Sequence, residues 1–318
     1  MLNDLQHQED VLRFLRRVVE GHATNPMLFV GAEGVGRRFA ALQVAKELFC
    51  TGGKTSDCPC VDCVQISQSM HPDLLYVAPS EGKDIGIEAI RGALGVIDTY
   101  PTQAPLRVIV LDGADRLTLP AANALLKTLE EPPSTVRIFL LAEVASRVLP
   151  TIRSRCGALN FRPLPEAFIQ ARVQEFESSA EKALVYARLG EGSVGRAIQY
   201  WGSGRLALRD KALTLLSYAL SKDTPGVFLL LDQLEKDLPL TLRFLNTLTH
   251  DLIMLGVASQ RIVNLDVEGT LRKMHAPAPD TWQRLHQGIE TMLATYRATK
   301  IQLAFHAKTL LLETFVGG

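Results

Sequence analysis

The stretch from Phe29 to Ala40, FVGAEGVGRRFA, has the residue types and the spacing that handle phosphate. It reads as a buried strand, a glycine loop and the start of a helix. Phosphate-binding loops have this layout because glycines let the backbone turn tightly and direct its amides at phosphate oxygens. The full pattern is G-x-x-x-x-G-K-[ST]. Its two glycine positions are filled by Gly31 and Gly36, with Gly34 between them.

The groups that act on ATP are missing from this loop. Arg37 stands in the lysine position, and Arg38 stands where a hydroxyl would bind magnesium. Arginine does not replace lysine here, because its broad fork does not fit where a point charge sat. Arg37 keeps a positive charge, which leaves weak nucleotide binding open. We therefore predict a nucleotide-handling fold that has lost, or nearly lost, its own ATPase and serves another subunit.

A second departure from an active ATPase follows the apolar run Arg107–Leu111, RVIVL. A continuous apolar run of this kind is typical of a fully buried parallel strand. It ends at Asp112, where a nucleotide fold holds Mg²⁺. The next residue is Gly113 rather than the glutamate that orients the attacking water. The alternative for Asp112 is a turn or helix-capping aspartate.

Four of the five cysteines are crowded together, in the spacing Cys50-x7-Cys58-x-Cys60-x2-Cys63. In a reducing compartment this crowding favours a metal over disulfides. Four thiolates close a tetrahedral structural zinc site with no open position, so the cluster predicts no catalysis. The alternative is a set of free thiols on a surface insertion, and the Cys58-x-Cys60 spacing is tighter than the usual C-x2-C. We favour zinc.

One arginine stands where it can act on the phosphates of another molecule. Arg155, in the sequence Ser154-Arg155-Cys156, comes just before the last predicted strand, at the rim of the sheet. An arginine there can reach across an interface and stabilise charge on a transferring phosphoryl group. The alternative is a surface arginine paired with Glu or Asp, and position alone does not separate the two.

Composition limits the classes of function. Of the 318 residues 47% are apolar, so the chain can bury the cores of two or three domains. Basic and acidic residues both number 34, and this zero net charge argues against a protein that binds nucleic acid alone by neutralising phosphates. The apolar runs fall short of a membrane span, and the first residues lack a signal-peptide core. We expect a cytoplasmic protein without membrane contact.

The elements that must position these residues alternate between helix and strand. Apolar spacing predicts helices over Asp10–Glu20, Arg37–Phe49, Ile85–Thr99 and Leu119–Glu131, interleaved with the strands Met27–Val30, Asp73–Val77, Arg107–Leu111 and Val136–Ala142. This order predicts an α/β three-layer domain with a mostly parallel sheet.

Beyond Pro163 the chain is predicted to be helical. Helices over Pro165–Ser178 and Ala180–Leu189, and the start of a third, form a small lid. The other predicted helices form a bundle: Leu206–Leu220, Val227–Lys236, Leu240–Leu255, Thr281–Thr295 and Ile301–Phe315. With a linker at Gly202–Gly204, the predicted domains are 1–162, 163–203 and 204–318.

Six motifs occur along the chain in a telling order: FVGAEGVGRR, the four-cysteine insertion, HPDL, VIVLDGADRL, AANALLKTLEEPP and RSRC. Together they resemble the delta-prime subunits of the bacterial DNA polymerase III clamp loader, a branch of the AAA+ family. The resemblance covers about residues 1–200 and is weaker beyond. RSRC is shared with the motor subunit of the same loader, and the defective phosphate loop selects delta-prime.

The resemblance implies a RecA-like AAA+ domain with a zinc module at the four cysteines, a helical lid and a helical collar that joins the subunits. It implies that Arg155 is a finger offered in trans to an ATP site on an adjacent motor (gamma/tau) subunit. Gly31, Gly36 and Asp112 are then relics. Arg196 takes the position of a second-domain arginine that senses nucleotide, and we favour a packing role or a vestige for it.

The expected function is that of a noncatalytic, stator-like subunit that does not hydrolyse ATP. Its partners would be the motor and delta subunits and, through the assembly, the sliding clamp and primer–template DNA. The main rival is an active AAA+ ATPase that uses Arg37 for lysine, either a motor subunit or a repair-linked ATPase, and Arg38 and Gly113 speak against it. A zinc-dependent nucleic-acid-binding module is disfavoured by the zero net charge.

Overall fold

The computed structural model describes residues 1–80, 83–97, 99–234, 236–258, 261–274, 279–299 and 303–315. The chain forms two compact units. The first comprises Met1–Pro165 together with Gly192–Gly195, and the second comprises Glu166–Glu191 and the chain from Arg196 onward.

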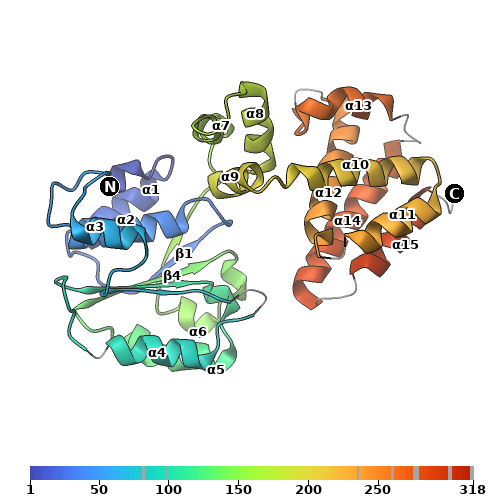
Figure 1. Ribbon diagram of the computed structural model, residues 1–318. Helices are drawn as coiled ribbons and strands as arrows, with labels where there is room; N and C mark the ends of the chain where they lie inside the picture. The colour runs from blue at the N-terminus through green and yellow to red at the C-terminus, as the bar shows by residue number, and fades with distance from the viewer. Residues whose placement is uncertain are drawn as a thin grey trace. The chain divides into compact units, whose positions relative to one another are not determined.

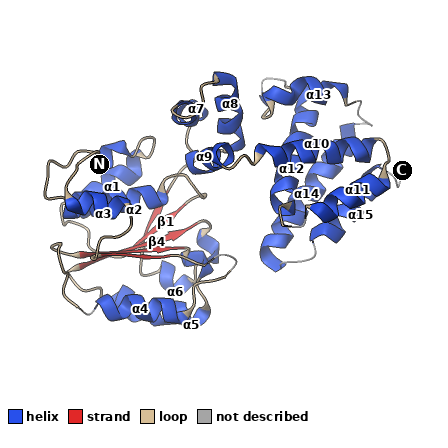
Figure 2. Cartoon of the chain, in the orientation of Figure 1, coloured by secondary structure: helices blue, strands red, loops and turns tan. Residues whose placement is uncertain are grey.

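A parallel five-stranded sheet forms the centre of the first unit (Figure 2). Its strands are β1 (Met27–Val30), β2 (Leu74–Val77), β3 (Arg107–Asp112), β4 (Val136–Ala142) and β5 (Gly157–Asn160). They lie in the order β2-β3-β4-β1-β5, and every neighbouring pair is parallel. The predicted α/β fold with a mostly parallel sheet is confirmed.

Helices cover both faces of this sheet (Figure 1). One layer holds α1 (Glu9–Val19), α2 (Arg37–Phe49) and α3 (Val61–Ser67), and the other holds α4 (Ile87–Ile97), α5 (Leu119–Glu130) and α6 (Pro150–Arg153). Successive side chains of a strand point to opposite faces. Val108 and Val110 therefore pack in the core beneath α1 and α2, whereas Ile109 and Leu111 pack in the core beneath α4 and α5.

A buried ion pair fastens the amino-terminal edge of the sheet. The Asp73 side chain is fully buried, and its carboxylate accepts hydrogen bonds from the backbone amides of Thr102, Gln103 and Ala104 at 2.7–2.9 Å. The Arg107 guanidinium lies 3.5 Å away. Burial opposes ionisation of Asp73, but the three amides and Arg107 outweigh it and lower its pKa. The segment that leads into β3 is held by these bonds.

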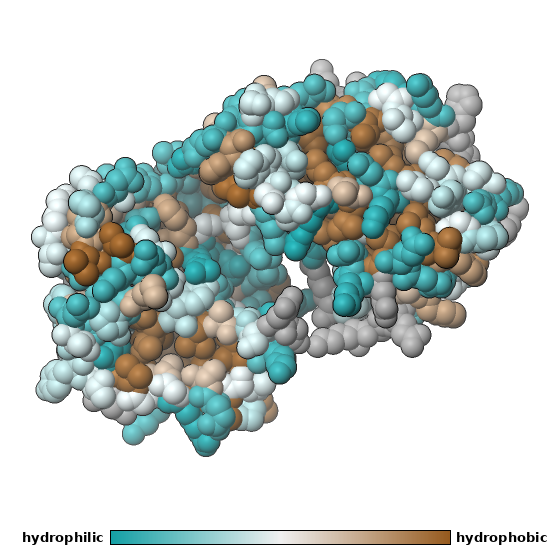
Figure 3. Space-filling model, in the orientation of Figure 1, coloured by the Kyte–Doolittle hydropathy of each residue, from teal (hydrophilic) through white to brown (hydrophobic). Residues whose placement is uncertain are grey.

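The second unit is helical. Its helices are α7 (Glu166–Gln174), α8 (Ala180–Leu189), α9 (Val194–Gly202, which begins in the first unit), α10 (Leu206–Leu220), α11 (Thr224–Gln233), α12 (Leu238–Leu255), α13 (Glu268–Lys273), α14 (Pro279–Thr299) and α15 (Leu303–Phe315). Short 3-10 helices occur at Leu2–Asp4, Ala114–Arg116, Ala145–Arg147 and Leu265–Val267. Hydrophobic residues gather on the visible face of this unit among hydrophilic ones (Figure 3).

Two prolines lie inside helices that we predicted to begin after them. Pro225 and Pro239 occupy the first turns of α11 and α12, so the predicted starts at Val227 and Leu240 were wrong by two or three residues. Proline fits a first turn because the amide that it lacks has no partner there. Ile301, the predicted start of the last helix, lies outside the described residues. No described helix is both long and apolar enough to cross a membrane.

Candidate phosphate loop, metal centre and arginine finger

The glycine loop joins the carboxyl end of β1 to α2, and its backbone requires glycine at the predicted positions. A Cβ atom at Gly31 would lie 2.8 Å from the carbonyl oxygen of Phe161, which follows β5. Gly34 and Gly36 have φ angles of +77° and +108°, a region that side chains disfavour. The loop therefore retains the shape of a phosphate cradle at the level of the backbone.

The two arginines that follow the loop occupy different surroundings. Arg37 is the first residue of α2 and is only 8% exposed. Among the described residues its guanidinium has no hydrogen-bond or ion-pair partner. The Arg38 guanidinium lies 4.4 Å from the centre of the Tyr76 ring and donates a hydrogen bond of 3.4 Å to Ser69 Oγ. Arg38 is thus directed at the neighbouring strand β2.

Asp112 is the last residue of β3, and its side chain is bound by a residue of the adjacent strand β2. Tyr76 Oη donates a hydrogen bond of 2.5 Å to Asp112 Oδ2. Burial, together with this bond, raises the pKa of Tyr76 above the ordinary value of a phenol, so the hydroxyl remains a donor even in alkaline solution. The carboxylate caps no helix in the described structure, and one of its oxygens is used within the protein.

Gly113 stands where an active ATPase has its water-orienting glutamate, and its backbone does not suit any side chain. Its φ angle is +104°, and a Cβ atom there would lie 3.2 Å from Pro79. A residue with a side chain would be strained at this position. The backbone conformation at Gly113 therefore disfavours a glutamate or any other residue with a side chain.

Gly195, a further glycine of the first unit, contacts the phosphate loop closely. The Gly195 amide donates a hydrogen bond of 3.2 Å to the Gly34 carbonyl oxygen. A Cβ atom at Gly195 would lie 2.8 Å from Gly34 Cα. The next residue, Arg196, belongs to the second unit and pairs with Glu191 at 2.7 Å. The structure thus brings the loop glycines, both arginines and Asp112 together at one sheet edge, whereas Arg196 belongs to the other unit.

Arg155 lies near the amino-terminal ends of the strands, whereas the phosphate loop lies at their carboxyl ends. It comes just before β5, whose first residue, Gly157, pairs with Met27, whereas Gly31 follows Val30 at the other end of the same pairing. Four residues of strand separate the two ends, about 13 Å. Arg155 forms an ion pair with Glu130, at the end of α5. The predicted alternative, a surface pair with an acidic residue, thus describes the geometry of Arg155 within this chain.

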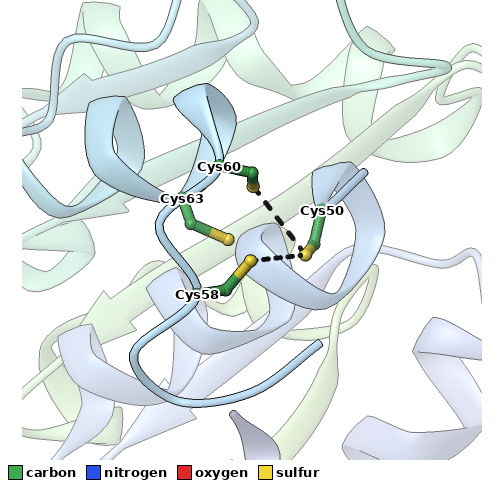
Figure 4. A group of neighbouring side chains, drawn as sticks. All are labelled: Cys50, Cys58, Cys60 and Cys63. Atoms are coloured by element: carbon green, nitrogen blue, oxygen red, sulfur yellow. Dashed lines mark hydrogen bonds between the residues drawn. The ribbon is translucent and has the colours of Figure 1, made fainter. Parts of the chain in front are cut away.

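The four clustered cysteines converge on one point (Figure 4). Cys50 follows α2, Cys58 lies in the connecting loop, Cys60 precedes α3, and Cys63 is in its first turn. All four sulfur atoms lie within 4.8 Å of one another, with Cys50 Sγ 3.6 Å from Cys58 Sγ and 3.9 Å from Cys60 Sγ.

These sulfur distances fit a tetrahedral zinc ion, for which Zn–S bonds of about 2.3 Å place the sulfurs about 3.8 Å apart. The loop is shaped to allow this, since a Cβ atom at Gly52 would lie 2.7 Å from Cys58 Sγ. A hydrogen bond from the Cys63 amide lowers the pKa of Cys60 to about 6, whereas burial raises the pKa of Cys63. Cys60 is therefore the readiest of these two thiols to supply a thiolate.

His71 links this cysteine module to the sheet and is not one of the clustered ligands. The residue is buried, with its ring 4.8 Å from that of Phe49. Its Nε2 lies 3.4 Å from Asp62, and its Nδ1 accepts a hydrogen bond from the Asp73 amide. The HPDL motif therefore has a structural role at the entry to β2.

Three residues that shape these sites were missed from the sequence: Tyr76, Glu130 and Gly195. Only the first had a readable signal. In the parallel pairing of β2 and β3, Tyr76 lies opposite Val110, so its side chain and that of Asp112, two residues on, share a face. The proximity of Tyr76 and Asp112 can be inferred only when the order of the strands is known.

Comparisons with known proteins agree with one another. A family model described as "DNA polymerase III, delta subunit" matches residues 7–165. The DNA polymerase III subunit delta′ of Bacillus subtilis is 31% identical over 73% of this chain and 70% of its own length, and that of Escherichia coli is 29% identical over 80% and 77%. A solved structure of a gamma subunit-related protein from Thermotoga maritima shares the fold, with a TM-score of 0.57 at 20% identity over 95% of this chain and 97% of its own.

The family match covers half of the chain, and two relatives align with most of it. The parallel sheet, the phosphate loop and the cysteine cluster lie within the matched residues. This chain belongs to the delta′ subunits of DNA polymerase III, the clamp-loader proteins of the AAA+ family.

Proposed function

We propose that this clamp-loader subunit is a noncatalytic stator. In this proposal it does not hydrolyse ATP, and it supplies Arg155 in trans to the ATP site of a neighbouring motor (gamma/tau) subunit while a sliding clamp is loaded on primed DNA. The observation that carries the proposal is the internal use of Asp112, the residue that would hold magnesium. Tyr76 binds its carboxylate, and Arg38 stacks on the tyrosine ring.

The rest of the loop supports the loss of ATPase. Phosphoryl transfer depends on positioning and on charge stabilisation at the γ-phosphate, which the lysine, the metal and the acid after the metal ligand provide. Here Arg37 replaces the lysine, and Gly113 adopts a backbone conformation in which a glutamate would be strained. The vestigial nucleotide site would then comprise Gly31, Gly34, Gly36, Arg37, Arg38, Asp112 and Arg196. Weak nucleotide binding through Arg37 is compatible with this proposal.

The position of Arg155 supports action in trans. It precedes the amino-terminal end of β5, whereas the chain's own phosphate loop follows the carboxyl end of the adjacent β1, so the length of a strand separates Arg155 from that loop. Its backbone is held by a hydrogen bond to Ile152, whose side chain is fully buried. A finger on such a rigid turn can be presented to a neighbour with little loss of entropy.

We further propose that zinc at the four cysteines is structural, and that 1–162, 163–203 and 204–318 act as nucleotide-type domain, lid and collar. The collar would join this chain to the motor and delta subunits. A groove of about 690 Å³ between α14 and α15, lined by Phe305 among others, offers a surface for this contact. Because chromosome replication takes place there, we propose that the chain works in the bacterial cytoplasm.

Nucleotide measurements on the purified chain test the first part. We expect no hydrolysis and at most weak binding by the chain alone, and a rise in DNA-dependent hydrolysis when it joins the motor and delta subunits. Hydrolysis by the chain alone would show that the loop works with Arg37 and that the protein is a motor.

Arg155→Ala tests the second part. The ATP site next to this chain should lose about 10³-fold in rate, while sites between motor subunits continue, so the total DNA-stimulated rate falls by the share of one site. The exposed Arg153→Ala is the matched control. Assembly, measured by size-exclusion chromatography, should be unchanged in both variants. An unchanged rate in Arg155→Ala would refute the finger role.

A further inference from the structure

Most of the donor groups of the Arg155 guanidinium are engaged by its own chain. Its Nε donates a hydrogen bond of 2.7 Å to Glu130 Oε1, and one of its terminal nitrogens forms an ion pair with the same oxygen. The other terminal nitrogen donates to the Thr151 carbonyl oxygen at 2.9 Å and to Ser154 Oγ at 3.3 Å. Four of its five N–H groups are thus committed, and a two-bond contact with a phosphate would require Glu130 to leave.

Glu130 occupies an unusual position for a carboxylate. It is the last residue of α5 and is followed by Glu131, so two acidic groups lie at the negative end of the helix dipole. Lys127 is the basic residue in the last helical turn. Arg155 supplies a positive charge directly to Glu130, and its departure would leave that carboxylate unpaired beside the helix end.

The pair is accessible and exchangeable. The side chains of Arg155 and Glu130 are 31% and 47% exposed. The backbone beneath Arg155 is fixed by hydrogen bonds to the last turn of α6, so exchange of partners needs rotation of side chains alone. An exposed ion pair of this kind is weak enough for a more highly charged anion to displace.

We propose that Glu130 has a parking role: it holds Arg155 in an ion pair within the chain and so competes for the finger. Arg155 is released only to the triphosphate of a neighbouring site. This inference rests on the proposed role of Arg155 in trans. A γ-phosphate carries more negative charge than one carboxylate and accepts two parallel bonds from the guanidinium. Glu130 keeps the finger until the neighbouring site closes around its triphosphate, so hydrolysis stays low before that closure. Glu130 is thus a positioning residue.

Glu130→Gln tests this in the assembled clamp loader. The amide keeps the shape of the side chain and removes its charge. We expect hydrolysis without DNA to rise about two- to fivefold, with a smaller change in the DNA-stimulated rate, so that the stimulation ratio falls. Glu131→Gln is the matched control, since Glu131 is exposed and adjacent. Both variants should unfold at the same temperature as the wild type.

The same substitution in the Arg155→Ala background separates the possible failures. There Glu130→Gln should change nothing, because the finger that it parks is gone. A rise in that background, or no rise in the otherwise wild-type chain while Arg155→Ala lowers the rate, overturns the parking role. If Arg155→Ala itself leaves the DNA-stimulated rate unchanged, the proposed finger role fails, and the parking role fails with it.

Discussion

Two side-chain contacts determine the surroundings of Asp112, at the carboxyl end of β3. Tyr76 donates to Asp112, and Arg38 stacks on the tyrosine ring from the place where a hydroxyl would bind magnesium. A carboxylate that already accepts a short hydrogen bond from a half-buried phenol has one oxygen fewer for a cation. If the proposed loss of ATPase is right, it is accompanied by new contacts at Asp112 as well as by missing groups.

Restoring the sequence pattern alone should not restore the site. We expect Arg37→Lys with Arg38→Thr to show no magnesium-dependent hydrolysis, because Tyr76 still binds Asp112. Adding Tyr76→Phe should tighten magnesium-dependent ATP binding about tenfold, since a competing charge-assisted hydrogen bond is removed. Titration with a fluorescent ATP analogue, with and without EDTA, measures this. Tyr100→Phe, at an exposed tyrosine, is the control for the third substitution; equal affinities with either tyrosine variant would contradict the role of Tyr76.

Asp73 sets an acid limit on the stability of the first unit. Its pKa is lowered in the folded state, so its contribution is present above the unfolded value of about 3.9 and is lost as the pH falls through the lower folded value. Asp73→Asn should cost roughly 3 kcal/mol at pH 7, because buried amides and Arg107 lose a charged partner. The difference from the wild type should shrink below about pH 4.

Urea unfolding followed by circular dichroism between pH 3 and 7 provides the measurement. The exposed Asp280→Asn serves as control, and its effect should be within about 0.5 kcal/mol of zero. A pH-independent loss in Asp73→Asn would assign the effect to packing.

At the scale of elements, we expect the order of the cysteine module to depend on a bound zinc ion. The purified chain should contain one zinc ion, and Cys63→Ser should lose it, because four thiolates are needed to close the site. Cys156→Ser, at the fifth cysteine, should keep it. Elemental analysis counts the metal, and chelation should make the loop 51–57 sensitive to protease. Zinc-free protein with four reactive thiols would instead support the free-thiol interpretation.

The elements that the sequence predicted best are those with strong local signals. Met27–Val30, Val136–Ala142 and Ala180–Leu189 begin and end as predicted. The helices α3, α6 and α13, of seven, four and six residues, were missed because two turns or fewer show little periodicity.

The site divides in the same way. The loop glycines follow from a local pattern and from backbone angles that only glycine adopts readily. The pairs Tyr76–Asp112 and Glu130–Arg155 join residues 36 and 25 positions apart, so they depend on strand order and helix packing that no local pattern encodes.

At the scale of the whole molecule, the helical unit should determine whether the chain joins its assembly. Phe305 is 64% exposed and lines the groove between α14 and α15. Phe305→Gln should weaken association with the other clamp-loader subunits about tenfold, because an exposed aromatic anchor at an interface contributes more than 1 kcal/mol. Leu229→Gln, on α11 with the same exposed fraction, is the matched control. Analytical ultracentrifugation measures both, and equal effects would argue against the groove as the contact.

The bond between Tyr76 and Asp112 also has a historical consequence. Once a phenol occupies the place of a metal ion and the following residue adopts a glycine-only backbone, a mutation that returns the lysine or the hydroxyl brings no benefit by itself. Regaining an ATPase would require several changes together, each neutral or harmful alone. For a subunit with the proposed noncatalytic role, such an arrangement would make the loss of hydrolysis hard to reverse in evolution.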